Sequence, residues 1–373
     1  MKENCSTFHQ PIKALYVHVP FCKSKCPYCD FFSVSHLEYV KEYEKFLHKE
    51  FSLKQPVLEA FPTIYFGGGT PSLMPPEFFY SFLSRVSQYS EVTVEVNPES
   101  ATLSYLRELK DAGINRISIG IQTLSEKLLK FLGRRHSSKQ ALRALENAVS
   151  VFKNVSVDIM FGIPGQTVWS IEKELKQILE FPIKHVSAYA LTIYENTPFF
   201  HQLSENDLVG DEETKKMYDL IRDLLKAEGF LHYEISNFAK AGFECRHNIH
   251  YWRLDNYEGL GPSAASFVGN VYRKNYANLN RYFLSLESNL TPIEEAVAFS
   301  VKELKEMKLA MGLRLMSGVN LKSLGIKEKL EKEELQVLEE AGYIEYDFPI
   351  LKLTEKACFV SNYVISKIIK ALL

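Results

Sequence analysis

Three cysteines stand within eight residues near the start of the chain: Cys22, Cys26 and Cys29, with the spacing C-x3-C-x2-C. Three thiolates on one short loop can bind three irons of a cubic iron–sulfur cluster, which leaves the fourth iron free to bind a small molecule. Structural zinc is the alternative, but zinc prefers four protein ligands, commonly in paired C-x2-C knuckles. The candidates for a fourth zinc ligand are Cys5, His18 and His36.

A second motif, Gly67-Gly68-Gly69-Thr70-Pro71, follows a predicted strand. Consecutive glycines let the backbone approach a ligand closely and expose its N–H groups. A flexible turn between a strand and a helix is the simpler interpretation. The motif is not a phosphate-binding Walker loop, because no Gly-Lys-Ser/Thr follows it.

The bulk composition is that of an ordinary globular protein, with 46% hydrophobic and 24% charged residues in a chain of 373. The net charge of −2 gives no basic field, so we do not expect binding to nucleic acid. The first residues contain no apolar signal segment, and no run of about 18 apolar residues predicts a membrane span. We therefore expect a cytoplasmic protein with reduced thiols.

Six stretches rich in β-branched or aromatic residues alternate with stretches of helical periodicity. The predicted strands are Ala14–Val19, Thr63–Phe66, Val92–Val96, Arg116–Ile121, Ser156–Phe161 and His185–Leu191. The predicted helices are Glu38–Leu53, Pro76–Tyr89, Thr102–Asp111, Lys139–Val149, Val168–Leu179 and Glu212–Glu228. Six β–α units in series predict a parallel sheet covered by helices. We interpret several strands, such as 117–121, as apolar throughout because both faces are covered.

Four polar residues lie at or near the ends of the later strands: Glu95, Gln122, Arg134 and Asp158. A single polar residue is usually a solvated surface group. A set of them at the carboxyl ends of parallel strands is different, because it is placed to converge on one ligand. We expect these four side chains to share a site with the cysteine loop.

The character of the sequence changes near residue 272. The predicted parts are a first domain over 1–271, a connector over 272–291 and a C-terminal domain over 292–373. From Pro292 we expect a long amphipathic helix, then a shorter helix near Glu328–Ala341. Tyr343–Tyr346 and Leu351–Thr354 predict a hairpin, and a last helix follows. Helices with a hairpin indicate a small winged-helix-like domain.

The motifs occur in the order seen in radical S-adenosylmethionine (SAM) enzymes. Those that carry the resemblance are the cysteine loop, Gly67-Gly68-Gly69-Thr70-Pro71, Glu95-Val96-Asn97-Pro98, Ser118-Ile119-Gly120-Ile121-Gln122 and Asp158-Ile159-Met160-Phe161-Gly162-Ile163-Pro164-Gly165-Gln166-Thr167. From about Tyr16 to Phe267 the chain resembles the coproporphyrinogen dehydrogenase-like branch of that superfamily. The resemblance implies an incomplete (β/α)6 barrel, open on one side, with a small C-terminal helical or winged-helix-like domain.

The resemblance also implies two cofactors. Cys22, Cys26 and Cys29 would hold a [4Fe–4S] cluster whose open iron chelates the methionine part of SAM. The positions that match SAM contacts are Tyr16, Gly68, Gly69, Thr70, Glu95, Gln122, Arg134 and Asp158. An electron donor would reduce the cluster, and cleavage of SAM would give a 5′-deoxyadenosyl radical.

The branch contains two kinds of protein: an oxygen-independent coproporphyrinogen III oxidase, which decarboxylates propionate side chains, and a haem-binding chaperone. The oxidase type typically has a further cysteine two residues after the third, where this chain has Phe31. That difference favours the chaperone, with the oxidase as the alternative and an enzyme for another tetrapyrrole as a third possibility. The chaperone interpretation implies haem as a ligand and client proteins that accept it, membrane-associated respiratory enzymes among the expected clients.

A segment over 245–267 resembles the haem-associated part of the chaperone type, through the motif His-Asn-x-x-Tyr-Trp at 247–252. Imidazole is a good ligand of haem iron, and His247 is our first choice, with Cys245 and His250 as alternatives. Tyr251 and Trp252 offer flat apolar faces to a porphyrin. Arg246 or Arg253 could pair with the haem propionates. The structural alternative is a packed aromatic cluster with a hydrogen-bonded histidine.

Overall fold

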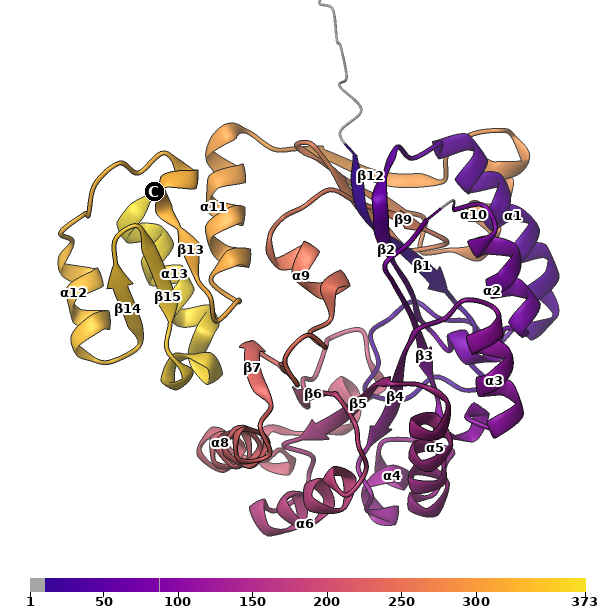
Figure 1. Ribbon diagram of the computed structural model, residues 1–373, viewed down its shortest axis with the longest axis horizontal. Coiled ribbons are helices and arrows are strands. Elements are labelled where there is room, and N and C mark those ends of the chain that lie inside the picture. Colours follow the sequence, from indigo (N-terminus) through magenta and orange to yellow (C-terminus); the bar gives the residue numbers. More distant parts are fainter. Residues whose placement is uncertain (1–10, 87) are drawn as a thin grey trace, which may run out of the picture.

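The computed structural model describes residues 11–86 and 88–373 (Figure 1). Cys5 lies outside these residues. The six predicted strands are all present, and they pair in parallel in chain order from β1 to β6. Their bounds are β1 Ile12–Val19, β2 Leu58–Gly68, β3 Glu91–Val96, β4 Arg116–Gln122, β5 Asn154–Phe161 and β6 His185–Ala190. The predicted topology, six β–α units in an open sheet, is confirmed.

Helices follow each strand and cover the outer face of the curved sheet (Figure 1). They are α1 Val40–Lys54, α2 Pro76–Leu83, α3 Leu103–Asp111, α4 Glu126–Phe131, α5 Ser138–Val151, α6 Val168–Leu179 and α8 Asp211–Ala227. A short α7, Pro198–Gln202, lies between β6 and α8. Serine and threonine caps fix several starts: Ser137 accepts from Gln140 N at the start of α5 and Gln140 caps it in return.

The interpretation of the strands as apolar throughout is wrong. In β4, Ile117, Ile119 and Ile121 are fully buried in the core shared with the helices, whereas Ser118 and Gly120 line a cavity on the other face. The same alternation in β3 places Glu95 in the cavity, next to the outward-facing Val94. The outer face therefore buries branched aliphatic side chains, each worth about 1.5–3 kcal/mol, and leaves the concave face polar.

Both edges of the barrel sheet are extended. β9 (Tyr257–Leu260) pairs in parallel with β1, and β10 (Ala265–Val268), β11 (Val271–Asn275) and β12 (Ile293–Ala298) continue outward in antiparallel order. At the other edge β8 (Asn237–Ala239) and β7 (Leu231–Glu234) follow β6. The short helix α9, Arg246–Trp252, lies between these two edges on the concave side and contacts β1 and β2 (Figure 1).

Residues 272–291, predicted to be a connector, contain most of β11 and the helix α10, Leu279–Glu287. The long helix expected from Pro292 is also wrong at its start, because β12 comes first and α11 spans Val301–Gly312. β12 pairs with β11, so tertiary pairing overrides the helical pattern there.

The C-terminal part has a hydrophobic core of its own, built around side chains such as Leu309, Leu338, Leu351 and Val364. Its elements are α11, β13 Val319–Asn320, α12 Glu333–Glu340, β14 Ile344–Asp347, β15 Ile350–Leu353 and α13 Ser361–Leu372. The predicted hairpin is confirmed as β14 and β15, which pair antiparallel, and β13 joins them in a three-stranded sheet. Within the described part of the chain, no helix is long and apolar enough to span a bilayer.

Candidate functional site

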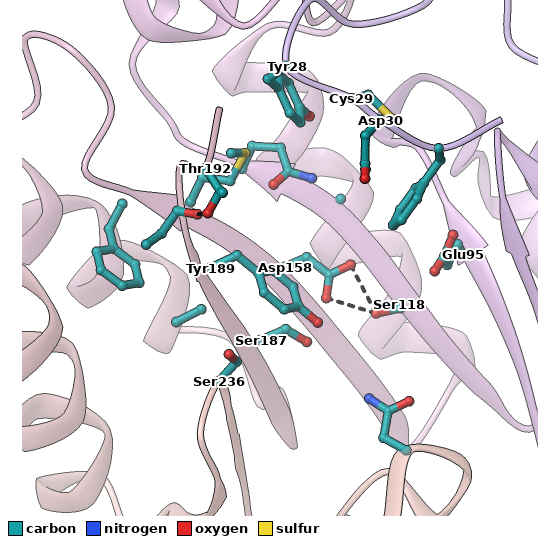
Figure 2. Close-up of a pocket in the computed structure, with 18 of the residues that line it drawn as sticks. Tyr28, Cys29, Asp30, Glu95, Ser118, Asp158, Ser187, Tyr189, Thr192 and Ser236 are labelled. Atoms are coloured by element: carbon teal, nitrogen blue, oxygen red, sulfur yellow. Dashed lines mark hydrogen bonds between the residues drawn. The ribbon is translucent and has the colours of Figure 1, made fainter. Parts of the chain in front are cut away.

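A cavity of about 680 Å³ opens at the carboxyl ends of the parallel strands. Its walls come from the cysteine loop, the ends of β2 to β6, the segment 235–248 and the C-terminal part of the chain. Figure 2 shows Cys29 and Asp30 on the loop, across the cavity from Asp158 and Tyr189 on the strands. Of the eight residues predicted to contact SAM, those that line the cavity are Gly68, Gly69, Thr70, Glu95, Gln122, Arg134 and Asp158.

The cysteine loop is held in place by backbone hydrogen bonds. Cys22 N donates to Val34 O at 2.9 Å, and Cys29 N donates to Cys26 O at 3.1 Å. Two side chains reach the sulfur atoms: the Thr70 hydroxyl lies 3.4 Å from Cys22 Sγ, and Arg134 Nη1 lies 3.9 Å from Cys26 Sγ. Thiolates are stabilised by such donors and by the nearby positive charge.

The three thiols are free and partly exposed. Burial raises the pKa of Cys29 to about 11, and the neighbouring Cys26 and Cys22 add to the rise, so the three sulfur atoms share one small region. In the part of the chain that the structure describes, no three His, Cys, Asp or Glu side chains form a group that could hold a metal ion. The ligands of a cubic cluster bind different irons, so they need not converge on one point as the ligands of a single metal ion do. The donor set, three thiols beside a guanidinium, fits such an anionic cluster.

The glycine turn is shaped by packing against β1. A Cβ on Gly69 would lie 2.7 Å from Phe21 O and 2.9 Å from Val19 O, and Gly69 N donates to that same Val19 O at 2.8 Å. Gly68 has φ +107°, and a Cβ there would meet the His18 ring at 2.6 Å. The protein itself therefore requires these two glycines, and both also line the cavity.

Glu95 and Asp158 place two buried carboxyl groups on the concave face. The Tyr65 hydroxyl donates to Glu95 Oε1 at 2.9 Å, and Ser118 Oγ lies 3.0 and 3.1 Å from the two oxygens of Asp158 (Figure 2). Burial raises the pKa of Glu95 to about 7, and the charge of Asp158 adds to the rise. The pKa of Asp158 is also raised, chiefly by burial.

This shift predicts a pH dependence of stability. The pKa of Glu95 is higher in the folded state, about 7, than its ordinary value of 4.5, so the folded state holds the proton more tightly. The contribution of Glu95 to the free energy of unfolding should fall as pH rises from about 4.5 to about 7 and level off above that, by a few kcal/mol at most. Buried histidines such as His18 and His136, whose pKa burial lowers to about 4, act in the opposite direction over the same range. Glu95→Gln should remove the falling contribution from the wild-type profile, measured by urea unfolding across pH. Glu146→Gln, at an exposed position on α5, should leave it unchanged; a wild-type slope kept in Glu95→Gln would contradict the assignment.

Arg134 joins the loop to the strands. Its Nη2 donates to Asn97 Oδ1 at 2.8 Å and to Gly120 O at 2.9 Å, while Nη1 faces Cys26. Gln122 closes the same wall and adopts a left-handed conformation at φ 66°. Tyr16 does not line the cavity: its hydroxyl lies 3.1 Å from His18 Nδ1 and its ring stacks on Tyr65.

The haem-associated motif forms a packed cluster in this structure. His247 is 1% exposed, with Nδ1 2.9 Å from the Thr63 hydroxyl and Nε2 2.8 Å from the Tyr251 hydroxyl. Burial lowers the pKa of His247 to about 3. Both ring nitrogens are occupied, so in this conformation His247 presents no free nitrogen to a haem iron. The expected apolar faces of Tyr251 and Trp252 do not line the cavity either.

The two alternative ligands are engaged as well. His250 Nδ1 lies 2.9 Å from Asp255 Oδ2. Cys245 is fully buried with its sulfur 3.7 Å from Glu91 Oε1, and burial raises the pKa of this thiol to about 12. Arg246 and Arg253, the expected propionate partners, are exposed and lie outside the cavity lining.

The model of the radical SAM superfamily matches residues 16–178. The heme chaperone HemW of Bacillus subtilis is 32% identical over 95% of this chain and 98% of its own length. The HemW of Lactococcus lactis is 31% identical over 96% of this chain and 97% of its own length. The chain belongs to the HemW family. A zebrafish relative, radical S-adenosyl methionine domain-containing protein 1, mitochondrial, is 36% identical over 83% of this chain and 74% of its own length.

The solved structure of coproporphyrinogen III oxidase, HemN, from Escherichia coli superimposes with a TM-score of 0.82 over 96% of this chain and 91% of its own. The two sequences are 19% identical, so the match establishes a common fold for HemN and this HemW-family chain. The family predicted from the sequence motifs is therefore confirmed.

Sequence reasoning missed part of the cavity wall in this HemW-family chain. From the haem-associated motif only Asn248 lines the cavity, and the C-terminal part contributes Arg314, Cys358, Phe359, Ser361 and Asn362. Arg116, at the start of β4, also lines it. The alternation in 117–121 could have indicated the polar interior, since an inward Arg116 is in register with Ser118. No sequence signal indicated the contribution of the C-terminal part.

Proposed function

We propose that this protein is a haem chaperone that binds a [4Fe–4S] cluster, SAM and haem and delivers haem to client proteins. The observation that carries the proposal is the convergence of the cysteine loop and seven of the eight SAM-matching positions on one cavity, in a chain of the HemW family. The relatives from Bacillus subtilis and Lactococcus lactis are named heme chaperones.

The residues present suit both cofactors of a radical SAM protein. Cys22, Cys26 and Cys29 would hold the cluster, which supplies an electron for cleavage of SAM when bound. Arg134, which lies beside Cys26 and the backbone of Gly120, would bind the carboxylate of SAM. Asp158, which Ser118 holds through both of its oxygens, would accept from the ribose hydroxyls.

Phe31 favours the chaperone over the oxidase. It occupies the position of the further oxidase cysteine, lines the cavity and is 57% exposed. An exposed phenyl ring at the mouth of a cavity offers an apolar face to a porphyrin, and it offers no thiol to the chemistry of the cluster.

The proposal is tested by two measurements on anaerobically reconstituted protein. Titration with haem should show saturable binding of about one equivalent. Incubation with coproporphyrinogen III, SAM and a reductant should give no protoporphyrinogen above a protein-free control. Formation of that product would replace the proposal with the oxidase alternative, and absence of saturable haem binding would remove the chaperone function.

A further inference from the structure

Three guanidinium groups line the cavity: Arg116, Arg134 and Arg314. Among the residues that the structure describes, none of the three forms an ion pair with a carboxylate. Arg134 is engaged by Asn97, Gly120 and Cys26, at the end of the cavity proposed for SAM. Arg116 and Arg314 therefore remain as two positive charges without a proposed ligand.

Arg116 is the more buried of the two, at 2% exposure, and its Nε and Nη1 atoms are buried without a hydrogen-bond partner. Leaving the donors of a buried guanidinium unpaired is costly, so a group that accepts from them is expected. Two carboxylates near Arg116 are already engaged, whereas Glu234, whose charge attracts Arg314, keeps Oε1 buried without a hydrogen-bond partner. Glu91 accepts from the backbone N–H groups of Arg246 and His247 at 3.3 and 3.1 Å, and Asp158 accepts from Ser118.

Arg314 comes from the loop after α11, in the C-terminal part. Its Nη2 donates to Asn362 Oδ1 at 2.9 Å, and its guanidinium lies 5.5 Å from the centre of the Trp252 ring. Asn362 lines the cavity with it. Arg314 is thus held from two sides, which orients its remaining donors before any ligand binds.

The two arginines flank the same segment. Tyr233 is among the groups that raise the pKa of Arg116, and Tyr233 O accepts from Met316 N at 3.0 Å, two residues after Arg314. Ile235 N donates to Arg314 O at 3.2 Å. Ser236 and Asn248, which also line the cavity, offer neutral hydrogen-bonding groups beside them. On the side of the segment 233–236, which we call the inner end, the cavity therefore has two guanidinium groups and two neutral hydrogen-bonding groups.

We propose that this inner end binds the two propionate carboxylates of haem, with Arg116 and Arg314 as the carboxylate-binding residues. The inference rests on the proposed function and assigns haem to the same cavity as the cluster and SAM. Haem carries its two carboxylates on one edge of an apolar ring, which matches two guanidiniums at the inner end and the exposed rings of Phe31 and Tyr189 elsewhere in the lining.

This assignment gives the motif at 247–252 a different role from iron ligation. His247 fixes α9 to β2 through Thr63, and Trp252 supports the Arg314 guanidinium. Asn248 is the member that faces the ligand. The motif positions the wall of the haem site. It acts on haem through Arg314 and Asn248, which contact the propionates, and not through the iron.

The experiment compares the Kd of haem with that of its dimethyl ester, which has the same ring and iron but no carboxylate charge. Wild-type protein should bind haem at least about tenfold more tightly than the ester, the size expected of one charge-assisted hydrogen-bonded pair. Arg314→Gln should weaken haem binding by about tenfold and leave the affinity for the ester unchanged, which separates charge recognition from general damage to the site. Arg116→Gln, in folded protein, should also weaken the binding of haem by about tenfold and leave the affinity for the ester unchanged.

Arg143→Gln, at an exposed position on α5, is the matched control and should keep the wild-type preference. Arg253→Gln tests the rival expectation that exposed arginines of α9 bind the propionates. Equal affinity of wild-type protein for haem and ester, an unchanged preference in Arg314→Gln, or a preference lost in Arg253→Gln would each overturn the inference while haem binding itself stands. No saturable binding of either porphyrin would overturn the proposed function and the inference together.

Discussion

Cys26→Ala is expected to remove the iron–sulfur cluster. After anaerobic reconstitution, the variant should have iron and sulfide at background and should lack the cluster absorption and the EPR signal of the reduced wild-type protein. The reason is the ligand count: the loop offers three thiols, and Cys26 is the one that Arg134 faces at 3.9 Å. Two remaining thiolates would leave two irons without protein ligands.

The matched control is Cys5→Ala, because Cys5 is a cysteine of the same chain that the zinc alternative needs as a possible fourth ligand. We expect this variant to keep the wild-type content of iron and sulfide. The contrary result is stoichiometric zinc and no iron in the wild-type protein, with the zinc lost in Cys5→Ala. It would show a zinc site instead of a cluster, and the proposed binding of SAM would then be wrong as well.

Gly69→Ala is expected to destabilise the fold severely, by roughly 3 kcal/mol or more, as overpacking against a fixed backbone does. The new Cβ would lie 2.7 Å from Phe21 O, 2.9 Å from Val19 O and 3.0 Å from Phe21 N. These atoms belong to the end of β1 and the start of the cysteine loop, so they cannot move without disturbing the β1–β2 pairing or the loop. Thermal and urea unfolding measure the loss.

Gly210→Ala supplies the control for the same substitution. Gly210 has φ −64°, and no heavy atom lies within 4 Å of a Cβ built there. It precedes α8, where alanine is a poorer cap than glycine, so a loss of about 1 kcal/mol at most is expected. Equal effects of the two substitutions would mean that the close approach of β2 to β1 is not what requires glycine at position 69.

The sequence predicted the fold well where local pattern and tertiary role coincide. Each of the six parallel strands was found because β-branched side chains on its outer face are buried against helices. The prediction failed at 293–298, where residues with a helical pattern form β12 because β11 offers them an edge to pair with. It also missed the polar interior, since Ser118 and Gly120 were interpreted as part of a continuous apolar run.

The sequence by itself determined the chemistry of the loop and the family. The spacing of Cys22, Cys26 and Cys29 and the motifs at the strand ends are local features, and parallel strands bring their carboxyl ends together in any such sheet. Only the tertiary structure decided whether the residues of the haem-associated motif are packed and hydrogen-bonded or open to a ligand. The Nδ1 atom of His247 is hydrogen-bonded to Thr63, which is 184 residues away along the chain, so the sequence could not show that this nitrogen is occupied.

The same holds for Arg116 and Arg314, which reach one cavity from the barrel and from the C-terminal part. Burial and partnership are properties of the folded chain, because they arise from side chains that sequence places far apart. The cysteine ligands could therefore be predicted from their spacing, whereas the partners of the buried charges could be identified only once the two parts of the chain were packed together.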